Sequence, residues 1–173
     1  GQCAGGAGVI PSRRALLASC ALFQDLGDDA SALEDLARVC EEQRAAGGEV
    51  VIDEASEGDT MFVIGAGSVR VQKRTVYDDA YTVTVLEGSA AGFFGELALL
   101  DRERRSASVV AQTDCEFLRI RRDRFEEWGN RHPAAGLRAT RRIAQYLAGR
   151  LRRANADVVT LFSALVEEIE QRL

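Results

Sequence analysis

A glycine, a carboxylate and an arginine stand close together in the stretch FFGELALLDRERRSAS, residues 93–108. Gly95 lets the backbone approach a ligand closely, and the residues after it have the helix preference needed for one short turn. The free amides at the start of such a turn point at an anion. Arg105 could return to the same anion with a forked pair of hydrogen bonds. The stretch therefore predicts an anion-binding site.

Glu96 needs a different partner, because its carboxylate would repel a bare phosphate. An ionised carboxylate only accepts hydrogen bonds, and a sugar hydroxyl can donate one. Burying Glu96 and Arg105 as a pair gains little, because lost solvation tends to cancel their attraction. We therefore predict a ligand between them, namely a nucleotide whose phosphate lies close to its sugar.

Helical apolar spacing precedes this stretch at 14–20 and 31–42, where Leu33, Leu36, Ala37 and Cys40 fall on one face. From residue 49 the period changes to alternation, which predicts a series of short strands. Their sequences are EVVIDEA, TMFVIGAG, SVRVQKRTV, AYTVTVLE, SASVVAQ and CEFLRI. Closely spaced strands without intervening helices indicate an antiparallel barrel or jelly roll. The anion-binding stretch then lies between two strands of this barrel.

The end of the chain is again helical, with a short helix at 122–130, a break at His132-Pro133 and one long helix over 134–173. Apolar residues recur along the long helix at spacings of four and three: Leu147, Leu151, Ala154, Val158, Leu161 and Leu165. Its first half could lie across the barrel. A helix of ~40 residues spans ~60 Å, more than such a barrel covers. We therefore expect a parallel homodimer through this helix.

Composition indicates one folded domain, since the chain has 173 residues, 46% of them hydrophobic and 28% charged. We expect a flexible leader at 1–13, a barrel domain with N-terminal helices at 14–133, and the long helix at 134–173. No apolar run could cross a bilayer, and the N-terminus lacks a secretory pattern. The net charge of -5 gives no general reason to expect nucleic-acid binding.

Cysteine and histidine usage argues against metal or redox chemistry. Cys3, Cys20, Cys40 and Cys115 include no CxxC pair, and the last three are interpreted as small buried hydrophobes. The only histidine, His132, precedes a proline and is interpreted as a helix-boundary residue. We expect a cytoplasmic chain without a metal site.

The stretch FGELALLDRERRSASVVA, residues 94–111, resembles the phosphate-binding cassette of cyclic nucleotide-binding domains. The segment GEVVIDEASEGDTMFVIGAGSVRV is similar to the early strands of that family, and CEFLRIRRDRFEEW to its last strands and following helix. The approach LEGSAAGFFGE departs from the pattern, so the loop before the site is altered. The resemblance extends over roughly 16–173 and implies a jelly-roll barrel that senses a ligand and has no catalytic residues.

The resemblance implies cAMP or cGMP as the ligand and assigns it to Phe94, Gly95, Glu96, Leu97, Ala98, Arg105, Ser106, Ala107 and Asn155. Gly95 and the amides of Leu97 and Ala98 would meet the ribose and cyclic phosphate. Glu96 would accept from the 2′-hydroxyl and Arg105 would hold the phosphate, whereas Arg104 would be solvated.

Two of the implied contacts stay open. Ser106 either adds a hydroxyl to the phosphate or a guanine edge, or is a small strand residue. Asn155 either reaches the purine or is exposed to solvent. The preferred base is likewise left open.

The output of such a sensor is not visible in the sequence. Family members that regulate transcription continue from the long helix into a helix-turn-helix, which this chain lacks, so we expect no DNA binding of that kind and an unidentified protein effector. The arginines of the long helix are interpreted as a solvated face: Arg138, Arg141, Arg142, Arg150, Arg152 and Arg153. Three alternatives stay open: a dimerising scaffold without ligand, a sensor fragment of a larger transcription regulator, and a cupin-like metal enzyme, against which the single histidine argues.

Overall fold

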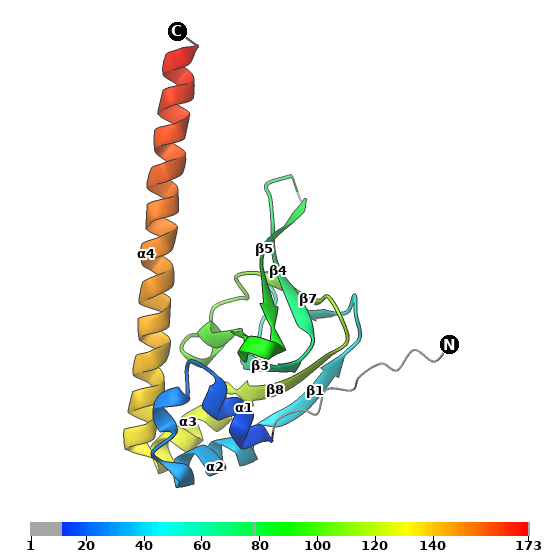
Figure 1. The fold of residues 1–173 in the computed structure, drawn as a ribbon, viewed down its shortest axis with the longest axis vertical. Coiled ribbons are helices and arrows are strands. Elements are labelled where there is room, and N and C mark those ends of the chain that lie inside the picture. Colours follow the sequence, from blue (N-terminus) through cyan, green and yellow to red (C-terminus); the bar gives the residue numbers. More distant parts are fainter. Residues whose placement is uncertain (1–11, 78, 173) are drawn as a thin grey trace, which may run out of the picture.

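The computed structural model describes residues 12–77 and 79–172. It places a group of short helices at one end of two β-sheets and a long helix beside them (Figure 1). The helices are α1 (Arg13–Ser19), η1 (Gln24–Leu26), α2 (Ala30–Val39), η2 (Gly88–Ala90), η3 (Glu96–Leu99), α3 (Arg122–Arg131) and α4 (Pro133–Gln171). The strands are β1 (Glu41–Ala45), β2 (Val50–Ile52), β3 (Thr60–Ala66), β4 (Ser68–Arg74), β5 (Ala80–Glu87), β6 (Phe93–Phe94), β7 (Ser108–Ala111) and β8 (Cys115–Arg121).

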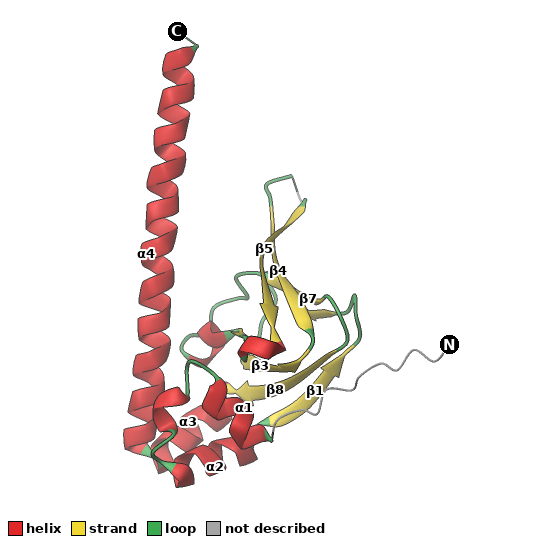
Figure 2. Ribbon diagram, in the orientation of Figure 1, coloured by secondary structure: helices red, strands yellow, loops and turns green. Residues whose placement is uncertain are grey.

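The strands form two antiparallel sheets with the orders β1-β8-β3-β6 and β2-β7-β4-β5. Figure 2 draws the strands in yellow beside the red helices. This arrangement confirms the expected fold class, mainly antiparallel β with flanking helices and a long C-terminal helix. The two sheets share no strand within the described residues. Closure into a jelly-roll barrel therefore stays a prediction.

Two buried clusters hold these layers together. One lies between the short helices and the first sheet and includes Phe23, Leu36 and Trp128. The other lies between the sheets, where the rings of Phe62 and Phe94 stack at 5.0 Å and both meet Phe117 edge-on. Phe94 immediately precedes Gly95, so this second cluster fixes the start of the anion-binding stretch.

The predicted helix at 31–42 is wrong at its C-terminal end. The helix stops at Val39, and residues 41–45 form β1, which pairs with β8 along five positions. The sequence EEQRA has good helix formers, but strand pairing overrides that local preference. Ion pairs join the two strands, Arg44 to Glu116 at 3.0 Å and Arg119 to Glu41. Strand β6, only two residues long, was also not predicted.

The long helix has two halves with different surroundings. Ala135, Ala139 and Ile143 are buried against the rest of the domain. Every described residue from Leu151 onward is exposed, and Figure 1 shows this part standing clear of the sheets. The prediction that the second half extends beyond the sheets is confirmed, whereas the buried first half packs mainly against α3 and η1. Pairing with a second copy stays a prediction. No helix in the described part of the chain is long and apolar enough to span a membrane.

The interpretation of the cysteines and histidine is confirmed where the structure describes them. Cys20, Cys40 and Cys115 are buried, whereas Cys3 lies outside the described residues. His132 separates α3 from α4, and its Nε2 atom lies 2.8 Å from Asp35 Oδ2 in α2. Most of the predicted leader also lies outside the described residues, but Arg13 already belongs to α1.

Candidate functional site

A cavity of about 560 Å³ lies between the second sheet, η3, the loop over 101–107 and α4. Eight of the nine predicted site residues line it: Phe94, Gly95, Glu96, Leu97, Ala98, Arg105, Ser106 and Ala107. Asn155 is exposed and is not among the lining residues, although its neighbour Ala154 is. The role of Asn155 stays a prediction that the cavity does not support.

Gly95 caps η3 in the left-handed backbone conformation, with φ of 76°. A Cβ atom at this position would lie 2.9 Å from both the Thr60 carbonyl and Arg105 Nη1, so side chains are excluded by strain and by space. The Ala98 amide donates to the Gly95 carbonyl at 3.1 Å. The predicted contact of this amide with a ligand would therefore compete with a bond inside the turn.

Arg105 is held by the loop that precedes β3. Its amide donates to the Ser56 carbonyl, and its own carbonyl accepts from the Ala55 amide, both at 2.9 Å. The side chain donates from Nη2 to the Thr60 carbonyl at 2.7 Å. Burial lowers the pKa of Arg105, against the opposing effect of Asp59, but leaves it a cation at physiological pH. A half-buried positive charge with fixed geometry thus faces the cavity.

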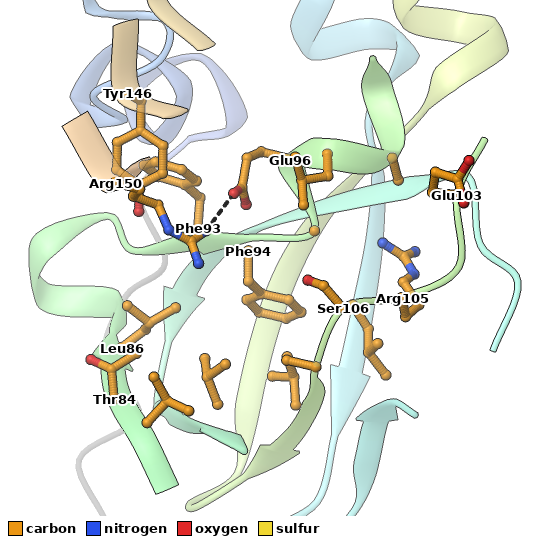
Figure 3. Close-up of a pocket in the computed structure, with 18 of the residues that line it drawn as sticks. Thr84, Leu86, Phe93, Phe94, Glu96, Glu103, Arg105, Ser106, Tyr146 and Arg150 are labelled. Carbon is orange, nitrogen blue, oxygen red and sulfur yellow. Dashed lines mark hydrogen bonds and ion pairs between the residues drawn. The ribbon is translucent and has the colours of Figure 1, made fainter. Parts of the chain in front are cut away.

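The other donors of the Arg105 guanidinium make no hydrogen bond to the residues that the structure describes. They are available to an anion in the cavity. Ser106 follows with its side chain exposed along the same wall, next to Arg105 in Figure 3. Arg104 also lines the cavity, but its Nη1 donates to the Ala55 carbonyl at 2.9 Å, so it is not simply solvated.

Glu96 is the only buried charged or polar side chain among the described residues, with 4% of its surface exposed. Its Oε1 accepts from Nη1 of Arg150 in α4 at 2.8 Å (Figure 3). Tyr146, one helical turn before Arg150, packs edge-on against Phe93 at 4.8 Å and lies 6.0 Å from the Arg150 guanidinium. Burial raises the pKa of Tyr146. The carboxylate therefore pairs with the long helix and not with Arg105.

Sequence reasoning missed Arg150, because it treated the arginines of the long helix as one solvated face. Three of them instead bind the rest of the domain: Arg138 to Asp29 at 3.2 Å, Arg142 to Asp25 at 2.8 Å, and Arg150 to Glu96. Their spacing of four and eight residues, in step with Ile143 and Tyr146, was the available signal.

The remaining wall is mostly apolar. Val71 on β4 and Val83, Thr84 and Leu86 on β5 line it, and Figure 3 shows Thr84 and Leu86 on the side away from Arg105. The cavity thus combines Arg105, the Glu96–Arg150 pair and an apolar wall on β4 and β5, and its lining also includes the charged side chains Asp101, Glu103, Arg153 and Asp157. No group of three or more metal-binding side chains occurs within the described part of the chain.

The family model of the cyclic nucleotide-binding domain matches residues 42–132. The chain belongs to this family. The match covers the two sheets, the turn η3 and the loop that carries Arg105, and it confirms the resemblance stated from the sequence. Arg105, Glu96 and the apolar wall on β4 and β5 all fall within the matched residues.

Curated relatives of this cyclic nucleotide-binding domain are proteins of several kinds. Glutaminase 1 of Bradyrhizobium diazoefficiens is 34% identical over 79% of this chain and 21% of its own length. The cAMP-dependent protein kinase regulatory subunit of Aspergillus fumigatus is 38% identical over 46% of this chain and 18% of its own length. The CRP-like cAMP-activated global transcriptional regulator of Mycobacterium tuberculosis is 27% identical over 84% of this chain and 62% of its own length. The chain thus spans less than two thirds of the length of each of these relatives.

Solved structures agree with the fold. The catabolite activator protein of Thermus thermophilus superimposes with a TM-score of 0.71 at 26% identity, over 81% of this chain and 62% of that one. A cAMP-bound PfPKA-R fragment superimposes with a TM-score of 0.60 at 28% identity, over 67% of this chain and 40% of that one.

Proposed function

We propose that this domain binds a cyclic purine nucleotide, cAMP or cGMP, and that its role is regulatory and not enzymatic. The observation that carries the proposal is the half-buried guanidinium of Arg105, held at the rim of a cavity whose floor carries a buried carboxylate. A cavity of about 560 Å³ is within the range of small-molecule sites. The names of two similar proteins, a cAMP-dependent kinase subunit and a cAMP-activated regulator, support the same ligand class.

Each part of the ligand has a chemical match in the cavity. Arg105 neutralises the cyclic phosphate with charge-assisted hydrogen bonds. Glu96 accepts a hydrogen bond from the 2′-hydroxyl of the ribose. The wall that includes Val71, Val83 and Leu86 covers the apolar faces of the purine. Ser106 and Thr84 each offer one hydroxyl to the phosphate or the base.

The long helix is the output of the proposed sensor. Arg150 already occupies one oxygen of Glu96, so a ribose at Glu96 shares or displaces a contact that holds α4. A ligand can shift α4 only by binding two of its positions with different affinity, and this shared carboxylate provides such a difference. We further propose that the exposed half of α4 pairs in parallel with a second copy, which carries the movement to an effector protein.

Isothermal titration of the parent chain with cAMP and cGMP, with 5′-AMP as the control, tests the proposal. We expect a preference for a cyclic nucleotide over 5′-AMP. Arg105→Ala should weaken binding roughly tenfold to a hundredfold, because it removes a charge-assisted contact of roughly 1.5–3 kcal/mol. Arg102→Ala, an exposed arginine of the same loop that does not line the cavity, is the matched control. Equal affinity of parent and Arg105→Ala would show that the anion binds elsewhere.

A further inference from the structure

The turn η3 is held from both ends by arginines of the two C-terminal helices. Arg150 of α4 bonds to the Glu96 carboxylate at its first residue. Arg122, the first residue of α3, donates from Nε to the Ala98 carbonyl at 2.6 Å. The turn is thus joined to α4 through Glu96 and to α3 through Ala98, two positions later.

Arg122 also reaches the loop on the other side of Arg105. Its amide donates to the Asp59 carbonyl at 2.8 Å, and its Nη2 lies 3.5 Å from the Gly58 carbonyl. Gly58 in turn lies directly against the Arg105 guanidinium. Arg122 therefore joins the turn η3 to the loop over 53–59, which holds Arg105 in place, although Arg122 itself does not line the cavity.

The helices that carry the two arginines are packed as one unit. Gly129 of α3 and Gly136 of α4 bring their backbones together, since a Cβ on Gly136 would lie 2.8 Å from the Gly129 Cα. Leu99 of η3 belongs to the same apolar cluster as Phe125 and Trp128 of α3. A shift of η3 is therefore transmitted to α3 by a polar and an apolar contact, and from α3 to α4 by close backbone packing.

We infer that Arg122 is a positioning residue that keeps η3 joined to the α3–α4 unit when a ligand occupies Glu96. A ribose competes with Arg150 for the carboxylate, so the contact of α4 with the turn changes on binding. The bond from Arg122 to Ala98 uses a backbone carbonyl that the ligand does not need. The contact of Arg122 with the turn is thus kept when the ligand binds, and movement of η3 reaches α3 and α4 through it. This inference rests on the proposed function.

Hydrogen exchange followed by mass spectrometry tests this role of Arg122, using the full chain with and without whichever of cAMP or cGMP binds more tightly. In the parent, the nucleotide should slow exchange in η3 and in the segment over 122–146, called the corner, which consists of α3 and the first part of α4. In Arg122→Met it should still slow exchange in η3 but no longer in the corner, and the dissociation constant should rise about tenfold. Arg124→Met is the matched control, because Arg124 of the same helix is exposed and pairs only with Glu127 among the described side chains.

Protection of the corner that persists in Arg122→Met would overturn the inference. If that variant does not fold, Arg122→Lys replaces it, since lysine keeps the charge but cannot reach both carbonyls at once. A comparison without nucleotide separates this inference from the proposed function. Exchange in the turn 96–99 and the loop 53–59 should rise together in either Arg122 variant, even if the parent binds neither nucleotide. Unchanged exchange in both segments would equally overturn the inference.

Discussion

Arg105 lies in a space that only glycine leaves open. A Cβ added to Gly58 would lie 2.3 Å from Arg105 Nε and 2.6 Å from its Nη2. The obstructing atoms are the far end of a flexible side chain, so the guanidinium can move aside while the backbone keeps its course. The position of the Arg105 guanidinium therefore depends on a residue that lies in another loop.

Gly58→Ala should weaken cyclic nucleotide binding by about tenfold or more, because the displaced guanidinium loses at least one charge-assisted hydrogen bond to the phosphate. Its melting temperature should stay close to that of the parent. Titration calorimetry and a thermal melt measure the two effects. Gly47→Ala is the control, since its Cβ would meet only ordinary contacts at 3.5 Å. Parent-like affinity in Gly58→Ala would mean that Arg105 does not hold the ligand.

The candidate site residues of the stretch over 93–108 were predicted from local sequence, and the residues elsewhere in the chain that contact them were not. Gly95, Glu96 and Arg105 fall within one short stretch, so their types and spacing were enough. Arg150 comes from a helix 54 residues beyond Glu96, and no local pattern specifies which carboxylate it meets. The pairing of Arg150 with Glu96 depends on how α4 packs against the rest of the domain, and this packing is visible only in the folded structure.

Among the elements, the crossing of α3 and α4 depends on two glycines. Gly136→Ala should lower the unfolding free energy by roughly 1–3 kcal/mol, because the new Cβ would lie 2.8 Å from the backbone of Gly129 and force the helices apart. Gly149→Ala in the same helix should instead raise it by roughly 0.5–1 kcal/mol, since its Cβ meets only side-chain atoms at 3.7 Å or more. Urea unfolding of both variants measures this contrast. Equal effects would remove the steric argument for the crossing.

The helical layer at the N-terminal end buries two thiols, each at the C-cap of a helix. Burial raises the pKa of Cys20 to about 11 and that of Cys40 to about 12, from a usual value of 9.0. The unfolded chain releases these protons above pH 9, whereas the folded chain keeps them. The folded state therefore loses stability as the pH rises above 9, by roughly 1 kcal/mol per thiol at pH 10.

Urea unfolding at pH 8 and pH 10 measures this loss, with Cys20→Ala/Cys40→Ala as the control that removes both thiols. The loss should be smaller in the double variant than in the parent. An equal loss in both proteins would assign the pH dependence to other groups. The same burial predicts that Cys20 and Cys40 react slowly with thiol reagents in the folded protein.

Alternation predicted the strands whose two faces differ in burial, such as β7, in which Val109 and Ala111 are buried and Ser108 and Val110 are partly exposed. It could not predict β1, whose five residues include two glutamates and an arginine and are mostly exposed. That segment is a strand because β8 offers it a complementary edge and opposite charges. Helix preference is a weak local term, and five backbone pairings outweigh it.

At the scale of the whole molecule, the second half of the long helix stands clear of the sheets, and its described residues from Leu151 onward are exposed. Leu151, Val158, Leu161 and Leu165 are each more than half exposed on one row of α4. Helices in proteins gain most of their stability by packing an apolar face, and apolar side chains that stay exposed on one row cost free energy. Pairing of two copies along this row would supply the packing and remove that cost.

Leu161→Glu should therefore convert a dimer into a monomer, because it places two like charges in the centre of a parallel seam. Sedimentation velocity or light scattering after size exclusion gives the mass directly. Thr160→Glu adds the same charge one residue earlier, on a different side of the helix, and should leave the dimer intact. A parent chain that is monomeric at high concentration, or a Leu161→Glu variant that remains a dimer, would contradict pairing through this row. If the dimer forms as expected, titration of Leu161→Glu with cyclic nucleotide then decides whether binding needs the second copy, since the cavity is lined by residues of a single chain.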